Sequence, residues 1–95
     1  MLSEIIEQYL AQTVEGRGEL ARVVGEGDTH ALARAAHTLR GASANVGASA
    51  LAAVCAEMEE QARSAQLDCA AGLVERFDTE FARVRDALND LATST

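Results

Sequence analysis

Apolar residues recur along this chain at steps of three and four, over four segments separated by short polar or glycine-containing stretches. This spacing places apolar side chains along one face of a helix. No proline interrupts the chain, and the good helix formers alanine, leucine, glutamate and arginine dominate it. The pattern predicts four amphipathic helices, over residues 3–25, 28–46, 48–64 and 67–92.

The apolar positions of these segments form the expected core. The first segment contributes Ile5, Ile6, Tyr9, Leu10, Val14, Leu20, Val23 and Val24. The second contributes Leu32, Ala35, Ala36, Leu39, Ser43 and Val46, and the third Leu51, Val54, Cys55, Met58 and Ala62. The fourth contributes Leu73, Phe77, Phe81, Val84, Leu88 and Leu91. Four such helices with short connections predict an all-α, antiparallel up-down four-helix bundle, and 95 residues are enough for one such domain over 1–95.

Local signals indicate where the helices begin and end. We expect Ser3 to cap the first helix and Asp28, which follows Gly25-Glu26-Gly27, to cap the second, because short oxygen-bearing side chains bind the free amides of a first turn. Gly47 can adopt the left-handed conformation that ends a helix. The predicted turns are therefore short, and adjacent helices are expected to be antiparallel neighbours.

Charge and composition narrow the possible partners and location. The formal net charge of −7 argues against nucleic acid, whose binding requires many cations against phosphates. No apolar run approaches the roughly 20 residues of a membrane span, and the first residues lack the basic-then-apolar pattern of a signal peptide, so we expect a cytoplasmic protein without a membrane segment. Reduced thiols are then expected at Cys55, in the core, and Cys69.

Three further expectations concern metals, assembly and chain organisation. No pair among the histidines and cysteines has the local spacing of a compact metal site, so no metal is expected. The four apolar faces can cover one another, which favours a monomer. Met1 and the complete set of helices favour a free-standing protein, although an excised domain would look similar.

His37 is the candidate reactive residue. With Leu32 at the centre of the buried stripe, His37 lies about 140° around the second helix and faces solvent. The same outer face carries small or basic side chains: His30, Ala33, Arg34, Arg40, Gly41 and Ala44. Exposed helix faces usually carry long charged side chains, whereas these small neighbours let a partner approach the imidazole closely. We therefore predict a docking surface centred on His37.

An exposed imidazole here can act as a nucleophile, because near neutral pH much of it carries a free nitrogen lone pair. A phosphoryl group accepted on that nitrogen would bring negative charge, which Arg40, one helical turn later, could offset. Gly41 costs a helix about 0.5–1 kcal/mol relative to alanine, so its presence suggests that space is needed there.

The stretch from Ala36 to Ala48, continued by Leu51, Cys55, Met58 and Glu59, resembles the histidine-containing phosphotransfer (HPt) domain of two-component phosphorelays. The resemblance implies that His37 takes a phosphoryl group from a receiver-domain aspartate and passes it to another receiver. The expected partners are receiver domains of response regulators or of a hybrid histidine kinase. In such domains the receiver supplies Mg²⁺, so no cofactor is expected on this chain itself.

The resemblance also assigns roles to neighbouring residues. Glu59 matches a glutamate or glutamine that orients the proximal ring nitrogen in relatives. Arg40 stands where the family usually has lysine, which retains the cation but changes its geometry, and Ala42 replaces the commoner serine. The chain has no room for an ATP-binding domain, so a phosphocarrier without kinase activity is expected. Two alternatives remain: the phosphoacceptor domain of a larger histidine kinase, and a helical adaptor that binds receivers without phosphotransfer.

Overall fold

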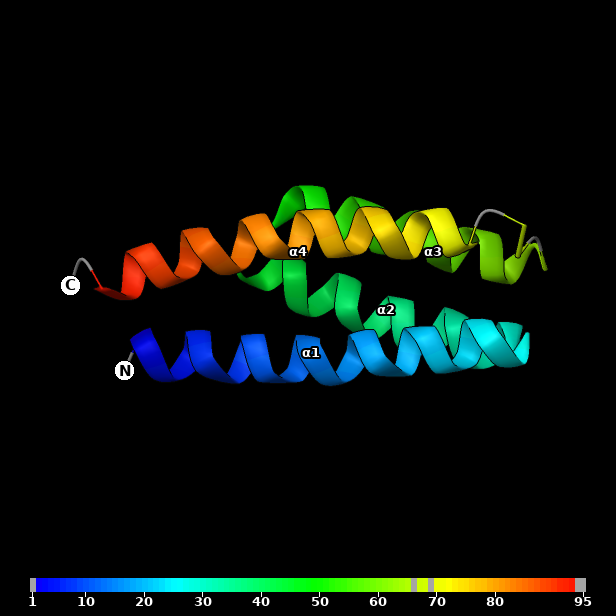
Figure 1. Cartoon of the computed structure of the whole chain (residues 1–95), viewed down its shortest axis with the longest axis horizontal. Coiled ribbons are helices and arrows are strands. Elements are labelled where there is room, and N and C mark those ends of the chain that lie inside the picture. Colours follow the sequence, from blue (N-terminus) through cyan, green and yellow to red (C-terminus); the bar gives the residue numbers. More distant parts are fainter. Residues whose placement is uncertain (1, 66, 69, 94–95) are drawn as a thin grey trace.

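The protein is described by a computed structural model that covers residues 2–65, 67–68 and 70–93. Four helices make up the chain: α1 (Leu2–Glu26), α2 (Thr29–Asn45), α3 (Ser49–Arg63) and α4 (Ala70–Thr93). They run alternately in opposite directions, each packed against the next, and α4 returns to α1 (Figure 1). The predicted all-α, antiparallel four-helix bundle is confirmed, and every helix end lies within three residues of its predicted position.

The inward positions of α1 follow a strict spacing of three and four residues: Ile6, Tyr9, Thr13, Gly16, Leu20 and Val23. Ile5 and Val14, expected in the core, fall beside this stripe and are 58% and 60% exposed, so that part of the prediction is wrong. Thr13 is fully buried in place of Val14. Its hydroxyl donates to the Tyr9 carbonyl at 2.6 Å, which satisfies the polar atom within the helix.

Gly16 permits a close approach of α1 to α2. A β-carbon built at Gly16 would lie 2.7 Å from Cδ2 of Leu39, which is buried on α2. At Gly18, by contrast, a β-carbon would meet nothing within 4 Å. Only the first of these two glycines is therefore required by packing within the chain.

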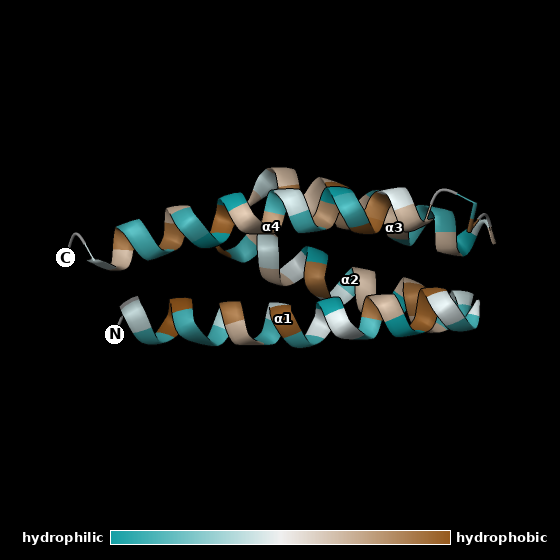
Figure 2. Cartoon of the chain, viewed as in Figure 1, coloured by the Kyte–Doolittle hydropathy of each residue, from teal (hydrophilic) through white to brown (hydrophobic). Residues whose placement is uncertain are grey.

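The core lies between the four helices, along each of which hydrophobic residues (brown) alternate with hydrophilic ones (teal; Figure 2). Its buried cluster comprises Leu20, Val23, Leu32, Ala36, Leu39, Leu51, Val54, Cys55, Met58, Ala62, Leu73 and Phe77. Two polar contacts tie α1 to its neighbours: a buried 2.9 Å hydrogen bond between the Tyr9 and Ser43 hydroxyls, and an exposed two-pronged ion pair from Arg17 to Asp78. Together they fix α1 against α2 and α4.

Cys55 is fully buried, as expected for a core residue. Burial raises the pKa of its thiol to about 12, partly offset by the positive charge of Arg40. Cys69 lies outside the described residues.

Two of the three predicted signals for helix ends are confirmed. Asp28 caps α2, its carboxylate accepting from the Ala31 amide at 3.1 Å. Gly47 has a left-handed φ of +77°, and α2 ends just before it. Ser3 is not the cap of α1, because the helix already begins at Leu2 and Ser3 lies within its first turn.

The helices have unequal lengths, which shapes the molecule. α1 and α4 have 25 and 24 residues, whereas α2 and α3 have 17 and 15. The start of α1 and the end of α4 therefore project together beyond the shorter pair, at the end where both termini lie (Figure 1). Leu91, predicted to face the core, is 47% exposed on this projection because α2 and α3 do not reach it. No helix among the described residues has the length and apolarity that crossing a membrane demands.

Candidate functional site

His37 lies at the middle of α2, on its outer side. The inner side of α2 is anchored in the core by Leu32, Ala36, Leu39 and Ser43. This anchoring sets the rotation of the helix, so the His37 side chain is 61% exposed, as its helical register predicts. The imidazole is therefore displayed on a rigid element and remains open to a partner.

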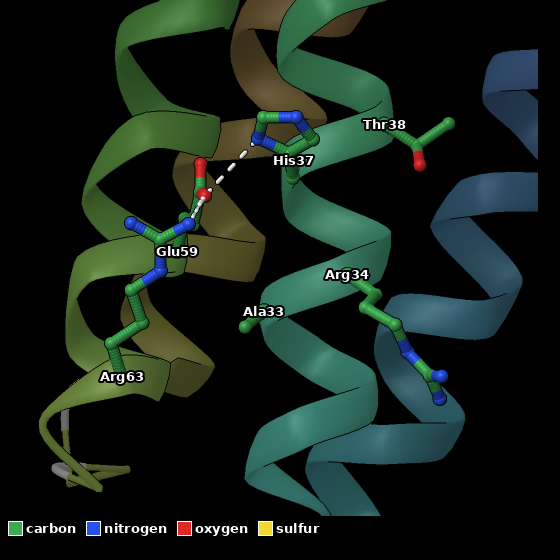
Figure 3. A pocket seen from close by; sticks show the side chains of 6 residues that line it. All are labelled: Ala33, Arg34, His37, Thr38, Glu59 and Arg63. Carbon is green, nitrogen blue, oxygen red and sulfur yellow. Dashed lines mark hydrogen bonds and ion pairs between the residues drawn. The ribbon is translucent and has the colours of Figure 1, made fainter.

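Glu59 of α3 is the residue directly behind the imidazole. α2 packs more extensively on α3 than on α1, and the buried Met58 and Ala62 hold this part of α3 in place. The Glu59 side chain is 3% exposed, and its Oε2 lies 3.1 Å from Nδ1 of His37 (Figure 3). The structure thus brings together the histidine and the carboxylate that the family resemblance pairs with it.

Two arginines compensate the buried charge of Glu59. Arg63, one turn later on α3, places a guanidinium nitrogen 2.5 Å from Oε2. Nε of Arg40, on α2, lies 3.5 Å from Oε1. A buried carboxylate requires such partners, since its desolvation is otherwise costly. Sequence reasoning missed Arg63, although its position four residues after Glu59 on one helix was an available signal.

The neighbours of Nδ1 favour opposite tautomers of the neutral ring. The contact with Glu59 is a hydrogen bond only when Nδ1 carries the proton, because a carboxylate can only accept. Nη2 of Arg40, 3.0 Å from the same nitrogen, can only donate and so requires an unprotonated Nδ1. With the proton on Nδ1, the lone pair is on Nε2, which lies on the side of the exposed ring away from Glu59 (Figure 3). The balance between the two contacts decides which nitrogen is free.

A hollow of about 340 Å³ opens beside the imidazole, lined by Ala33, Arg34, His37, Thr38, Glu59 and Arg63. Within this hollow the Arg34 side chain extends away from Glu59 (Figure 3). Among the described residues Arg34 has no carboxylate within ion-pair distance, whereas each of the other arginines has one. Its charge is therefore available to a molecule that approaches His37.

The remaining predicted surface residues lie on the same face of α2 but outside the hollow. His30 and Ala44 are exposed, seven residues before and after His37, which corresponds to about 10 Å along the helix in each direction. Gly41 is exposed, and a β-carbon there would meet nothing within 4 Å. Packing inside the chain therefore gives no reason for this glycine. Over the described part of the chain, no three His, Cys, Asp or Glu side chains gather closely enough to hold a metal ion.

A small helical bundle that displays one histidine, backed by a buried carboxylate and flanked by cations, defines a class of proteins that carry a chemical group on an exposed imidazole. Residues 4–92 match the Hpt domain family, and the chain belongs to that family. It is a histidine phosphotransfer protein of the kind that works in phosphorelays, where such domains carry phosphoryl groups and interact with receiver domains.

The crystal structure of the histidine-containing phosphotransfer protein B (HptB) from Pseudomonas aeruginosa PAO1 is similar to this fold. The two chains are 33% identical and superpose with a TM-score of 0.93, over 96% of this chain and 79% of that one. No curated protein matches the chain.

Proposed function

We propose that Nε2 of His37 accepts a phosphoryl group from the phospho-aspartate of one receiver domain and passes it to the aspartate of another. The Nε2 lone pair attacks phosphorus, the N–P bond forms, and the bond from phosphorus to the aspartate oxygen breaks, so that the carboxylate leaves with the electron pair. The reverse sequence delivers the group to the second receiver. Mg²⁺ is expected on the receiver and not on this chain.

The observation that carries the proposal is the hydrogen bond between His37 and Glu59. A buried carboxylate 3.1 Å from Nδ1 favours the proton on that nitrogen and leaves the outward Nε2 as nucleophile. When Nε2 takes the phosphoryl group, the ring becomes positively charged, and Glu59 stabilises that charge without moving. Glu59 therefore acts as a positioning residue.

Arg40 and Gly41 have separate roles in the proposal. The Arg40 guanidinium lies within 3.0 Å of the imidazole and offsets the charge of the incoming phosphoryl group. Gly41, one turn after His37, leaves open space for the receiver's active site. We expect Arg40→Ala to slow transfer more than it weakens receiver binding.

The receiver is expected to cover the outer face of α2 and the adjoining part of α3. On this face the small side chains of Ala33 and Ala44 leave room for a partner to approach His37. Arg34 offers a positive charge that has no ion-pair partner among the described residues. His30 lies at the edge of the same face. An acidic group on the receiver is the natural partner of Arg34.

The test is incubation of the purified protein with a panel of phosphorylated receiver domains and Mg²⁺, followed by assay of acid-labile, base-stable phosphate. His37→Gln should take no label and stay folded by circular dichroism, because His37 is exposed. His30→Gln is the matched control, since it removes the other histidine of the same helix face, and it should still take label because His37 is the acceptor.

Phosphoramidate, a small phosphoryl donor, separates intrinsic reactivity from partner choice. Labelling of wild type but not of His37→Gln by both donors supports the proposal. Receiver binding without transfer, together with no labelling by phosphoramidate, would instead indicate a helical adaptor. The cytoplasmic location and the monomeric state stay predictions.

A further inference from the structure

Two arginines hold the Glu59 carboxylate from different sides. Arg63 binds Oε2, the oxygen that also faces Nδ1 of His37. Arg40 approaches Oε1 with Nε at 3.5 Å, yet Oε1 is buried and receives no hydrogen bond from any described residue. The carboxylate is thus firmly bound at one oxygen and poorly satisfied at the other.

The Arg40 guanidinium also lacks a hydrogen-bond acceptor at His37 when the ring is in its reactive tautomer. With the proton on Nδ1, the Arg40 Nη2 at 3.0 Å faces another donor. A rotation of the Glu59 carboxylate towards Arg40 would relieve both groups, because two guanidinium nitrogens could then bind two carboxylate oxygens. That arrangement would take Oε2 away from His37 and leave the reactive tautomer without its acceptor.

We propose that Arg63 is a positioning residue that holds Glu59 on His37 against the competing attraction of Arg40. By binding Oε2 from the side of α3, Arg63 keeps this oxygen on Nδ1 and leaves Arg40 free to meet the phosphoryl group. The inference rests on the proposed function, because the tautomer matters only where Nε2 is the acceptor. Arg63 itself is 69% exposed, so its replacement leaves the core intact.

The test compares Arg63→Ala and Arg63→Lys with Arg76→Ala. Arg76 is also a surface-exposed arginine, and its 2.6 Å ion pair joins α4 to Glu57 of α3, so its loss removes an ion pair of α3 without touching Glu59. The first readout is the pair of ¹⁵N ring shifts of His37 in histidine-labelled protein at alkaline pH, which report the tautomer of the neutral ring. His30→Gln in all samples leaves a single histidine to observe. The second readout is the rate of phosphoryl transfer from a receiver.

Arg63→Ala should shift the ring towards the Nε2–H tautomer and slow transfer about tenfold, the scale of one lost hydrogen bond to a charged group. Arg63→Lys, which keeps a charge that can reach Oε2, should recover part of both effects, and Arg76→Ala should match the parent protein. Wild-type ring shifts in Arg63→Ala would overturn the inference. Slow transfer with unchanged ring shifts would overturn it too, because Arg63 would then act on the receiver.

The two proposals fail in distinguishable ways. If the parent protein took no phosphate from any donor, the proposed function would be wrong. The ring shifts need no donor, so they would still decide whether Arg63 positions Glu59.

Discussion

Replacement of Gly41 by alanine should make the protein more stable, and replacement by glutamine should make it a worse phosphocarrier. Glycine within a helix costs about 0.5–1 kcal/mol relative to alanine. At Gly41 a β-carbon meets nothing within 4 Å, so no clash offsets this gain. We expect Gly41→Ala to raise the free energy of unfolding by about that amount, and the melting temperature by about 2–8 °C for a domain of this size.

Two other glycines make this prediction specific. Gly18, inside α1, is equally open, and Gly18→Ala should give a similar gain in stability. At Gly16 the new β-carbon would lie 2.7 Å from Cδ2 of the buried Leu39. Overpacking of this kind costs about 1–3 kcal/mol and outweighs the propensity gain, so Gly16→Ala should be less stable than wild type.

The rate of phosphoryl transfer should distinguish a substitution at Gly41 from one at Gly18. Gly41→Gln places a long side chain one turn from His37 and should slow transfer from a receiver at least tenfold, whereas Gly18→Gln should not. Phosphoramidate labelling should stay unchanged in both variants, because a small donor needs no room for a protein partner. Thermal melts and receiver assays on the same samples test the reasoning. Normal receiver transfer by Gly41→Gln, or lower stability of Gly41→Ala, would refute it.

Three further predictions concern buried polar groups. Tyr9→Phe removes the 2.9 Å hydrogen bond to the fully buried Ser43 and should lower the free energy of unfolding by about 1 kcal/mol. In a double-mutant cycle measured by urea unfolding, Ser43→Ala should lower the free energy of unfolding less in the Tyr9→Phe background than in the wild type. Glu59→Ala should slow phosphotransfer tenfold or more, while Glu59→Gln, whose amide oxygen still accepts from Nδ1, should lose less; equal losses would show that charge matters and not the acceptor. Since burial raises the pKa of the Cys55 thiol from 9.0 to about 12, the folded protein keeps a proton that the unfolded chain releases, and stability should fall by roughly 1.4 kcal/mol per pH unit above pH 9. In a Cys69→Ser background, Cys55→Ala should remove that slope between pH 9 and 10.5, and an unchanged slope would assign it to another group.

Local chemistry made much of the fold predictable. The Asp28 cap, the Gly47 end and the inward stripe of α2 depend on neighbours within one or two turns, and they are found where the sequence indicates. The register of α1 was harder, because Val14 is more apolar than Thr13 and only the packing of Tyr9 and Gly16 against α2 decides which of them turns inward.

In the candidate site, too, some features follow from the local sequence and others depend on packing between helices. The exposure of His37 follows from the helical register of α2 alone. The contacts of Glu59 depend instead on the rotation of α3 against α2, which no single-helix pattern contains. Arg63 was missed although it lies one turn after Glu59 on the same helix, because a solvent-exposed arginine looks ordinary until the carboxylate beside it is seen to be buried.

The unequal helix lengths imply that the two ends of the molecule open at different free energies. In α4 the buried side chains end at Phe77, so its later turns are held mainly by partly buried contacts. Amide hydrogens there should exchange through local fraying, well below the free energy of global unfolding. The turns of α2 around His37 rest on the fully buried Leu32 and Leu39 and should exchange only with the whole bundle. The reactive imidazole is thus carried by the slowest-opening part of the fold, and motion at the projecting ends leaves its geometry undisturbed.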